Sequence, residues 1–114
     1  MSDVNMDSIL VSIKKLIGPS AIYEVFDPDL IMHINSTLFV LYQLGVLSDK
    51  FVVSDSSNSW SDLSTVKDIE AIKTYVYLKA RMYFDPPTNS ALISAINEQI
   101  KELEFRMNVE VDPE

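Results

Sequence analysis

Few side chains in this sequence have the chemistry to form a catalytic or metal site. His33 is the single histidine, and the chain has no cysteine. A Ser-His-Asp arrangement would therefore depend on His33, and thiolate nucleophiles and thiolate metal sites are excluded. We interpret His33 as a partly buried or surface histidine, because it lies within a strong helical pattern. The two glycines stand far apart, so no glycine-rich phosphate-binding loop is present.

A serine-rich loop bears a partial resemblance to a calcium loop. Asp55, Ser57 and Ser59 fall at the first, third and fifth positions of an EF-hand pattern. Trp60 and Val66 stand where that pattern needs Gly and Glu. The match fails, and we predict an exposed turn instead of a calcium site.

Two further patterns are weak indications of chemistry. Glu98 and Glu102 lie one helical turn apart, a spacing that would suit a shared cation or an acid–base pair. Lys101 and Arg106 are close in sequence, so we interpret this region as a solvated helix face. The glycosylation triplet at residues 35–37 lies in a helical pattern of a chain without secretion signals, and we interpret it as a chance match.

Size and charge narrow the function classes. The chain has 114 residues, 47% of them apolar, which is enough for one folded domain. Nine basic and 17 acidic residues give a net charge of −8, with a pI near 4.4. Such a surface disfavours tight nucleic-acid binding and docking on an anionic membrane. The acidic start and the lack of a long apolar run indicate an intracellular type of protein without a signal peptide or a membrane span.

The spacing of apolar residues predicts two helices in the first half of the chain. The first covers residues 9–17, with Asp7 or Ser8 as its N-cap. The second covers residues 27–44, with Asp27 as the N-cap before a proline. Each ends just before a glycine, the residue that most easily adopts the left-handed conformation that closes a helix.

A third helix is predicted to be the central one. Thr65 and Asp68 are placed as the ends of a capping box that opens it. Apolar residues cover most of its circumference, which is typical of a helix packed on several sides. We expect Tyr75 and Tyr83 in the core and Tyr77 facing a neighbouring subunit.

The fourth helix completes the predicted fold. It begins at Asn89 or Ser90 and continues to Met107. The overall prediction is an all-α fold, with four main helices in a compact bundle and one loop or short extended segment between the second and third. Residues 1–107 form the single helical domain, and residues 108–114 form a flexible acidic C-terminal tail.

One aromatic side chain in the polar loop has two possible roles. Trp60 either folds back into the helical core or anchors a partner protein, because buried indoles dominate many interfaces. Interleaved aromatic residues also occur in nucleic-acid-binding proteins, but this chain lacks the basic patch that accompanies them.

Five segments, in a characteristic order and spacing, resemble a known family. They are MDSIL at 6–10, IMHINS at 31–36, QLGV at 43–46, the stretch from KTY to FDPP at 73–87, and EQIKELE at 98–104. Together they resemble the small head-tail connector (adaptor) proteins of tailed bacteriophages, in the variety found in phages and prophages of Gram-positive bacteria. The resemblance covers most of the chain, and its specificity lies in the order of the segments.

The resemblance implies a virion structural protein at the head-tail junction, present in the host cytoplasm before assembly. A ring of about twelve copies would assemble on the portal protein after DNA packaging. It would then offer an attachment surface to a head-closure or tail-completion protein. No enzymatic activity, cofactor or metal belongs to this role. Candidate partner-binding residues are Phe51, Trp60, Asp62, Tyr77, Val109, Glu110, Val111 and Asp112.

Other functions are compatible with the same composition. An acidic helical inhibitor or regulator of a basic host protein would also be acidic and lack a catalytic site. Its binding should weaken steeply with salt, whereas apolar ring contacts should tolerate salt. An enzyme would need a cleft with a strongly shifted carboxylate. A head-closure or tail-completion role is disfavoured by the four helical patterns, because those proteins are more often rich in β-structure.

Overall fold

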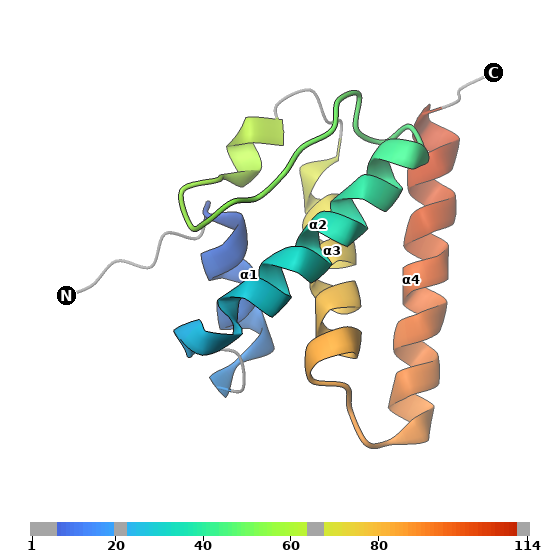
Figure 1. Cartoon of the computed structure of the whole chain (residues 1–114). Helices are drawn as coiled ribbons and strands as arrows, with labels where there is room; N and C mark the ends of the chain where they lie inside the picture. Colours follow the sequence, from blue (N-terminus) through green and yellow to red (C-terminus); the bar gives the residue numbers. More distant parts are fainter. Residues whose placement is uncertain (1–6, 20–22, 64–67, 112–114) are drawn as a thin grey trace.

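The fold is all-α, as the sequence predicts. The computed structural model describes residues 7–19, 23–63 and 68–111, and no strand occurs within these ranges. The main helices are α1 (Ile9–Ile17), α2 (Asp27–Gln43), α3 (Ile69–Phe84) and α4 (Ser90–Val111) (Figure 1). Two short 3-10 helices lie between them, η2 (Glu24–Phe26) before α2 and η3 (Trp60–Leu63) before α3.

Helix α3 lies at the centre of the bundle. It packs against α1, α2 and α4, and α4 runs antiparallel beside it after a short connection (Figure 1). Helix α2 crosses obliquely over α3. The largest fully buried apolar side chains come from α1, α2 and α3 and from one loop residue, and they are Tyr75, Ile9, Ile13, Leu30, Ile34, Leu38, Leu41, Ile72, Val53 and Val76. This arrangement confirms the prediction of a central third helix.

The first helix starts as expected and the second does not. Ser8 caps α1, because its hydroxyl accepts a hydrogen bond from the Val11 N–H at 3.2 Å. Asp27 is the first residue of α2, and Phe26 occupies the N-cap position without a side-chain cap. The prediction of Asp27 as N-cap is wrong because η2 continues directly into α2. The Asp27 carboxylate instead forms a 2.8 Å ion pair with Lys14 of α1.

The start of α3 differs from the predicted capping box. Asp68 is itself the N-cap, and its carboxylate accepts a hydrogen bond from the Ala71 N–H at 3.2 Å. Aspartate is a strong N-cap residue, so Asp68 needs no partner three residues upstream. The assignment of Asp68 to the inner end of a capping box is therefore wrong, and Thr65 lies outside the described residues.

Helix α4 is longer than predicted. Asn89 caps it by accepting hydrogen bonds from the N–H groups of Ala91 and Leu92, and the helix continues to Val111. The predicted end at Met107 is wrong: Asn108 still lies in the helix, and its side chain donates to the Leu44 carbonyl at 3.2 Å. This contact ties the last turns of α4 to the end of α2.

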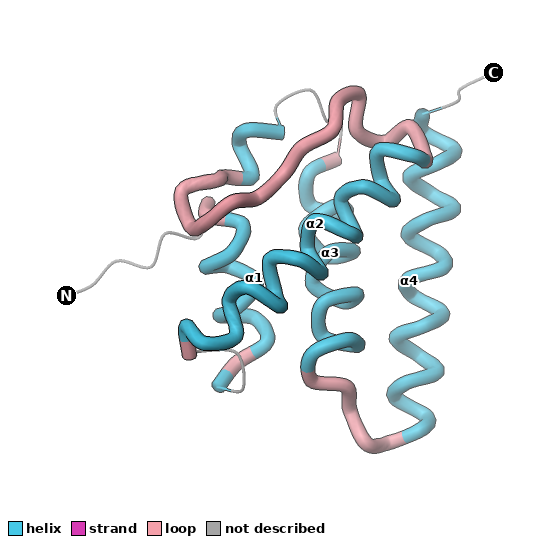
Figure 2. The backbone as a smooth tube through the Cα atoms, viewed as in Figure 1, coloured by secondary structure: helices cyan, strands magenta, loops and turns pink. Residues whose placement is uncertain are grey.

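The segment between α2 and α3 crosses the bundle as an irregular strap, which we define as residues 46–63 (Figure 2). The Asn35 side chain holds its middle, because it donates to the Val53 carbonyl at 3.0 Å and accepts from the Val53 N–H at 2.7 Å. Backbone bonds from Ile9 to Asn58 and from Trp60 to Asp7 hold its far end against the start of α1. The strap therefore connects α2 to the start of α1.

Candidate interaction site

Trp60 belongs to the core of the protein. Only 2% of its surface is exposed, and its indole N–H donates a 2.8 Å hydrogen bond to the Ser12 hydroxyl. The Ser12 hydroxyl in turn donates to the Ile9 carbonyl at 3.1 Å. Of the two roles predicted for this side chain, the structure supports the core role, since the indole is covered within the single chain.

The other residues predicted to bind partners, as far as their side chains are described, are spread over the strap, α3 and α4. Asp62 in η3 is exposed and accepts a hydrogen bond from the Ser59 N–H at 2.9 Å. Phe51 in the strap and Tyr77 on α3 are half-buried against the core, and Val109 on α4 is exposed. The side chains of Glu110 and Val111 and the whole of Asp112 lie outside the described part.

The turn at the tip of the strap satisfies its own polar groups. Asp55 accepts hydrogen bonds from the N–H and hydroxyl of Ser57, and these bonds lower the pKa of the Asp55 carboxyl. The Asn58 side chain accepts from the N–H groups of Ser54 and Asp55. The geometry confirms a turn at this position.

The two tyrosines expected in the core have different environments. Tyr75 is buried, and its hydroxyl donates a 2.6 Å hydrogen bond to Glu104 of α4. Burial, together with the Glu104 carboxylate, raises the pKa of Tyr75 above its usual value. Tyr83 is 59% exposed, so the prediction that it lies in the core is wrong. It lies in the last turn of α3, where its ring stacks on that of His33 from α2.

His33 connects α2 to α3. Its Nε2 lies 3.0 Å from the Lys79 carbonyl, and its ring stacks on Tyr83 with centroids 4.2 Å apart. Burial lowers the pKa of His33, the charge of Lys79 lowers it further, and the backbone hydrogen bond opposes both. This environment is that of a packing histidine that is half-buried, as the sequence indicates.

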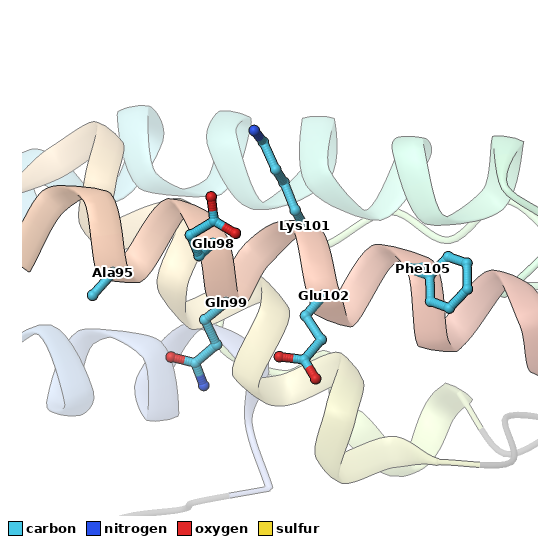
Figure 3. A pocket seen from close by; sticks show the side chains of 6 residues that line it. All are labelled: Ala95, Glu98, Gln99, Lys101, Glu102 and Phe105. Atoms are coloured by element: carbon cyan, nitrogen blue, oxygen red, sulfur yellow. The ribbon is translucent and has the colours of Figure 1, made fainter.

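The acidic residues of α4 form part of an exposed helix face. A shallow hollow there is lined by six exposed side chains of this one helix, Ala95, Glu98, Gln99, Lys101, Glu102 and Phe105 (Figure 3). Glu102 forms a 2.7 Å ion pair with Arg106 one turn further along. Both carboxylates are exposed, and none of the described elements covers them, as their sequence context predicts.

The described residues offer no other indication of chemistry. Within the ranges given above, no group of three or more His, Asp or Glu side chains is placed to hold a metal ion. None of the helices in those ranges combines the length and the apolar character needed to cross a membrane.

Sequence reasoning missed an exposed apolar line on α2. Val25, Met32 and Phe39 are 77%, 61% and 45% exposed, and they recur every seven residues along η2 and α2. A seven-residue spacing places side chains in one line along a helix. Two features of the sequence could have indicated this line. Apolar residues recur at a second set of helical positions, offset from the core positions, and residues 30–48 contain no Asp, Glu, Lys or Arg. Large apolar side chains that are exposed along one side of a helix are candidates for an interaction surface.

Comparison with known proteins identifies the family. The family model described as phage connector protein matches residues 9–114, which include all four main helices. No curated protein and no solved structure matched the chain. The family match extends over nearly the whole chain and agrees with the resemblance drawn from the sequence. This chain therefore belongs to the family of phage connector proteins.

Proposed function

We propose that this chain is a head-tail connector that assembles as a ring on the portal after DNA packaging. The observation that carries the proposal is the family match over residues 9–114. Phage connectors are structural proteins of the virion and contact other head or tail proteins. The first proposed partner is the portal. The second is a head-closure or tail-completion protein. Neighbouring copies of the chain, about twelve in the ring, are the third kind of partner.

The charge of the chain suits a ring around exiting DNA. Each copy has a net charge of −8, so a closed ring would line or surround the DNA path with negative potential. A duplex gains affinity chiefly where basic side chains replace its counterions. An acidic ring therefore leaves the DNA free to slide, and we expect no tight DNA binding by the free chain.

The exposed apolar residues suit assembly through contacts that tolerate salt. Several large apolar side chains are exposed on the described surface, among them Val25, Met32 and Phe105. Apolar contacts are weakened little by salt, whereas contacts between exposed charges are screened. This property favours a connector over an inhibitor that binds a basic host protein through its charge.

The C-terminal residues are a second proposed contact region. Val109 is exposed near the end of α4, and the chain continues beyond this point with three acidic residues in its last five. We propose that the residues after Met107, the first of which continue α4 as far as Val111, engage the portal or the next protein.

The decisive experiment measures the mass of the complex formed with the portal protein encoded near this chain. The free chain, measured at the same concentration and moderate salt, is the control. We expect a monomer that adds to the portal in about twelve copies. Absence of any complex, even at high concentration, would contradict the proposal.

A DNA titration tests the sliding argument separately. Double-stranded DNA is added to the free chain at low salt, where electrostatic binding is strongest. We expect no complex at micromolar protein. Tight binding that weakens steeply with salt would contradict the proposed role of the acidic surface.

A further inference from the structure

We infer that, in a ring of copies, the exposed line on α2 of one copy packs lengthwise against the outer face of α4 of the next copy. The inference rests on the proposed function, because it assigns the copy-to-copy contact within that ring. It commits to a second copy of this chain as the occupant of both helix faces.

The α2 surface has the spacing of a helix-packing seam. Its apolar line is Val25, Met32 and Phe39, and between these residues lie the exposed Asp29 and Ser36. Positions that alternate by four and three residues form the strip that a second helix covers in lengthwise packing. Residues 25, 29, 32, 36, 39 and 43 follow this spacing and are all exposed.

Helix α4 has a matching strip on the side away from α3. Its inner line of Ile96, Ile100, Leu103 and Met107 contributes to the core. The outer strip comprises Ala91, Ala95, Glu98, Glu102, Phe105 and Val109, which alternate by four and three residues and are all exposed. Figure 3 shows the middle of this strip, with none of the described elements lying in front of it. The small residues Ala91 and Ala95 leave room for a second helix at one end of the strip. Phe105 and Val109 offer it apolar surface at the other end.

Charge decides which strips can meet. Pairing α4 with α4 of another copy would bring Glu98 and Glu102 close to the same carboxylates, which is unfavourable at a contact that excludes water. The α2 strip carries one carboxylate, Asp29 near its start, and residues 30–48 contain no Asp, Glu, Lys or Arg, so most of its length is free of this conflict. It also offers a cation, since the Lys50 ammonium lies 5.7 Å from the ring centre of Phe39.

Lys50 is available for a carboxylate of the neighbouring copy. Its contacts within the described part of the chain are to the rings of Phe39 and Tyr42, and no ion pair to it is formed there. A cation at the edge of an apolar strip complements the acidic centre of the α4 strip. The α2 surface therefore accepts α4, whereas α4 repels itself.

Symmetry also favours contact between unlike surfaces. A contact of α2 with α2 would be the same patch on both copies, so it would close into a dimer and stop. A contact of α2 with α4 uses two different patches, leaves one of each free, and can repeat until a ring closes. Figure 1 shows α2 crossing one side of the bundle and α4 forming its edge, so one copy can contact a neighbour through each helix.

One helix pair is a small contact. Stable complexes commonly bury about 1,600 Å² in total, more than a single lengthwise pair of short helices provides. The contact is therefore expected to be weak between free copies and to become effective when the portal holds neighbours side by side. This agrees with a monomeric free chain.

Cysteine cross-linking tests the contact, because the natural chain has no cysteine. The double variant Ser36→Cys/Ala95→Cys places one thiol on each strip, and Ser36→Cys/Glu102→Cys samples the other half of α4. Each is assembled on the portal and joined with a short bis-maleimide. A ladder of covalent multimers of this chain is the expected result for at least one of them. The control Ser56→Cys/Ala95→Cys, with one thiol at the exposed strap tip, should give no ladder.

The outcomes separate the inference from the proposed ring. If the unmodified chain forms no complex with the portal, the proposed function fails. If it forms the ring and neither strip pair gives a ladder, the inference alone fails. Dimers from the single variant Ser36→Cys would also overturn it, because they would show α2 against α2.

A charge pair at one position gives a second test. Met32→Glu and Met32→Lys place opposite charges at the same exposed site of α2. We expect Met32→Glu to weaken ring assembly about tenfold or more, because it faces the acidic α4 strip, and Met32→Lys to be tolerated. Circular dichroism of both free variants confirms the fold. Equal effects of the two substitutions would contradict the α4 strip as the partner surface.

Discussion

The strap and α4 both pack apolar side chains against the α1–α3 core, but they differ in the polar bonds that hold them. The strap is also held by polar bonds to residues distant in sequence, such as Trp60 to Ser12 and Val53 to Asn35. Helix α4 is held along one apolar line, and hydrogen bonds from Tyr75 to Glu104 and from Asn108 to Leu44 link it to α3 and to the end of α2. An irregular segment needs such bonds because it has no internal ladder, whereas a helix satisfies its own backbone.

The difference teaches where stability and where assembly reside. The strap buries Val53, Trp60 and Leu63, so changes there should unfold the protein. The outer strip of α4 and the line on α2 contribute little to the core, so changes there should leave the fold intact and alter contacts with partners. The predictions below compare matched substitutions in the two kinds of region.

The largest expected effect comes from removing the buried indole. Trp60→Ala should lower the free energy of unfolding by about 3–5 kcal/mol, because it leaves a cavity and removes the hydrogen bond that the Ser12 hydroxyl accepts from the indole. Phe105→Ala on the outer strip of α4, where the ring is 70% exposed, should change it by no more than about 0.5 kcal/mol. Urea unfolding of both variants gives the comparison.

The Trp60→Ala and Phe105→Ala variants can also contradict the core role of Trp60. If Trp60→Ala remained as stable as the natural chain and lost only portal binding, Trp60 would be a partner anchor. The strap would then not be the stabilising region that the buried indole indicates.

A smaller effect is expected at the asparagine that holds the strap. Asn35→Ala removes both hydrogen bonds to Val53, whose side chain is 1% exposed, and should cost about 2 kcal/mol. Asn108→Ala removes one exposed hydrogen bond to Leu44 and should cost less than about 1 kcal/mol. Thermal or urea unfolding measures both. Similar losses of stability in the two variants would contradict the idea that hydrogen bonds matter more for holding the strap than for holding α4.

The polar link between α3 and α4 gives the next prediction. Tyr75→Phe should cost about 1–2 kcal/mol, because it deletes the hydrogen bond to Glu104 and keeps the ring in the core. The pKa of Tyr75 is raised in the folded state, so its contribution is present at neutral pH and is lost as the pH rises above about 10, the value of a free tyrosine.

Alkaline unfolding separates the hydroxyl from the ring. The natural chain should lose stability above that pH more steeply than Tyr75→Phe, when both are followed by urea unfolding over a pH series. Identical alkaline slopes would show that the Tyr75 hydroxyl titrates as in the unfolded chain.

The smallest effect concerns His33. The pKa of this side chain is lowered from the ordinary value of 6.5, so the folded state binds a proton less readily than the unfolded chain. Its contribution to stability is therefore complete above pH 6.5 and declines as the pH falls below that value. Proton NMR of the ring should give a midpoint under 6.5, and His33→Gln should flatten the acid slope. A midpoint above 6.5 would contradict the packing against Lys79 and Tyr83.

Local patterns in the sequence predict the helices well. Apolar periods gave all four main helices, and Gly45, with a φ of 85°, closes the second one as expected. The errors at Asp27, Asp68 and Met107 are errors of helix ends, where neighbouring turns decide between equivalent caps. Tyr83 was misplaced because a periodic pattern gives the side of a helix and not how far along that side the neighbouring helices reach.

Contacts between distant segments were beyond sequence reasoning. Nothing local in the triplet at residues 35–37 indicates that Asn35 holds Val53, or that Trp60 finds Ser12. The candidate contact residues were chosen for residue type and for the family resemblance. The exposed line on α2 needs the structure, because only burial distinguishes its apolar residues from those of the core.

An electron-microscopy reconstruction of the natural chain bound to its portal tests the connector account most directly. The account predicts a closed ring of about twelve copies on the portal, with α2 of each copy lying along α4 of the next. Isolated copies on the portal that do not touch each other, or no bound density at all, would contradict it.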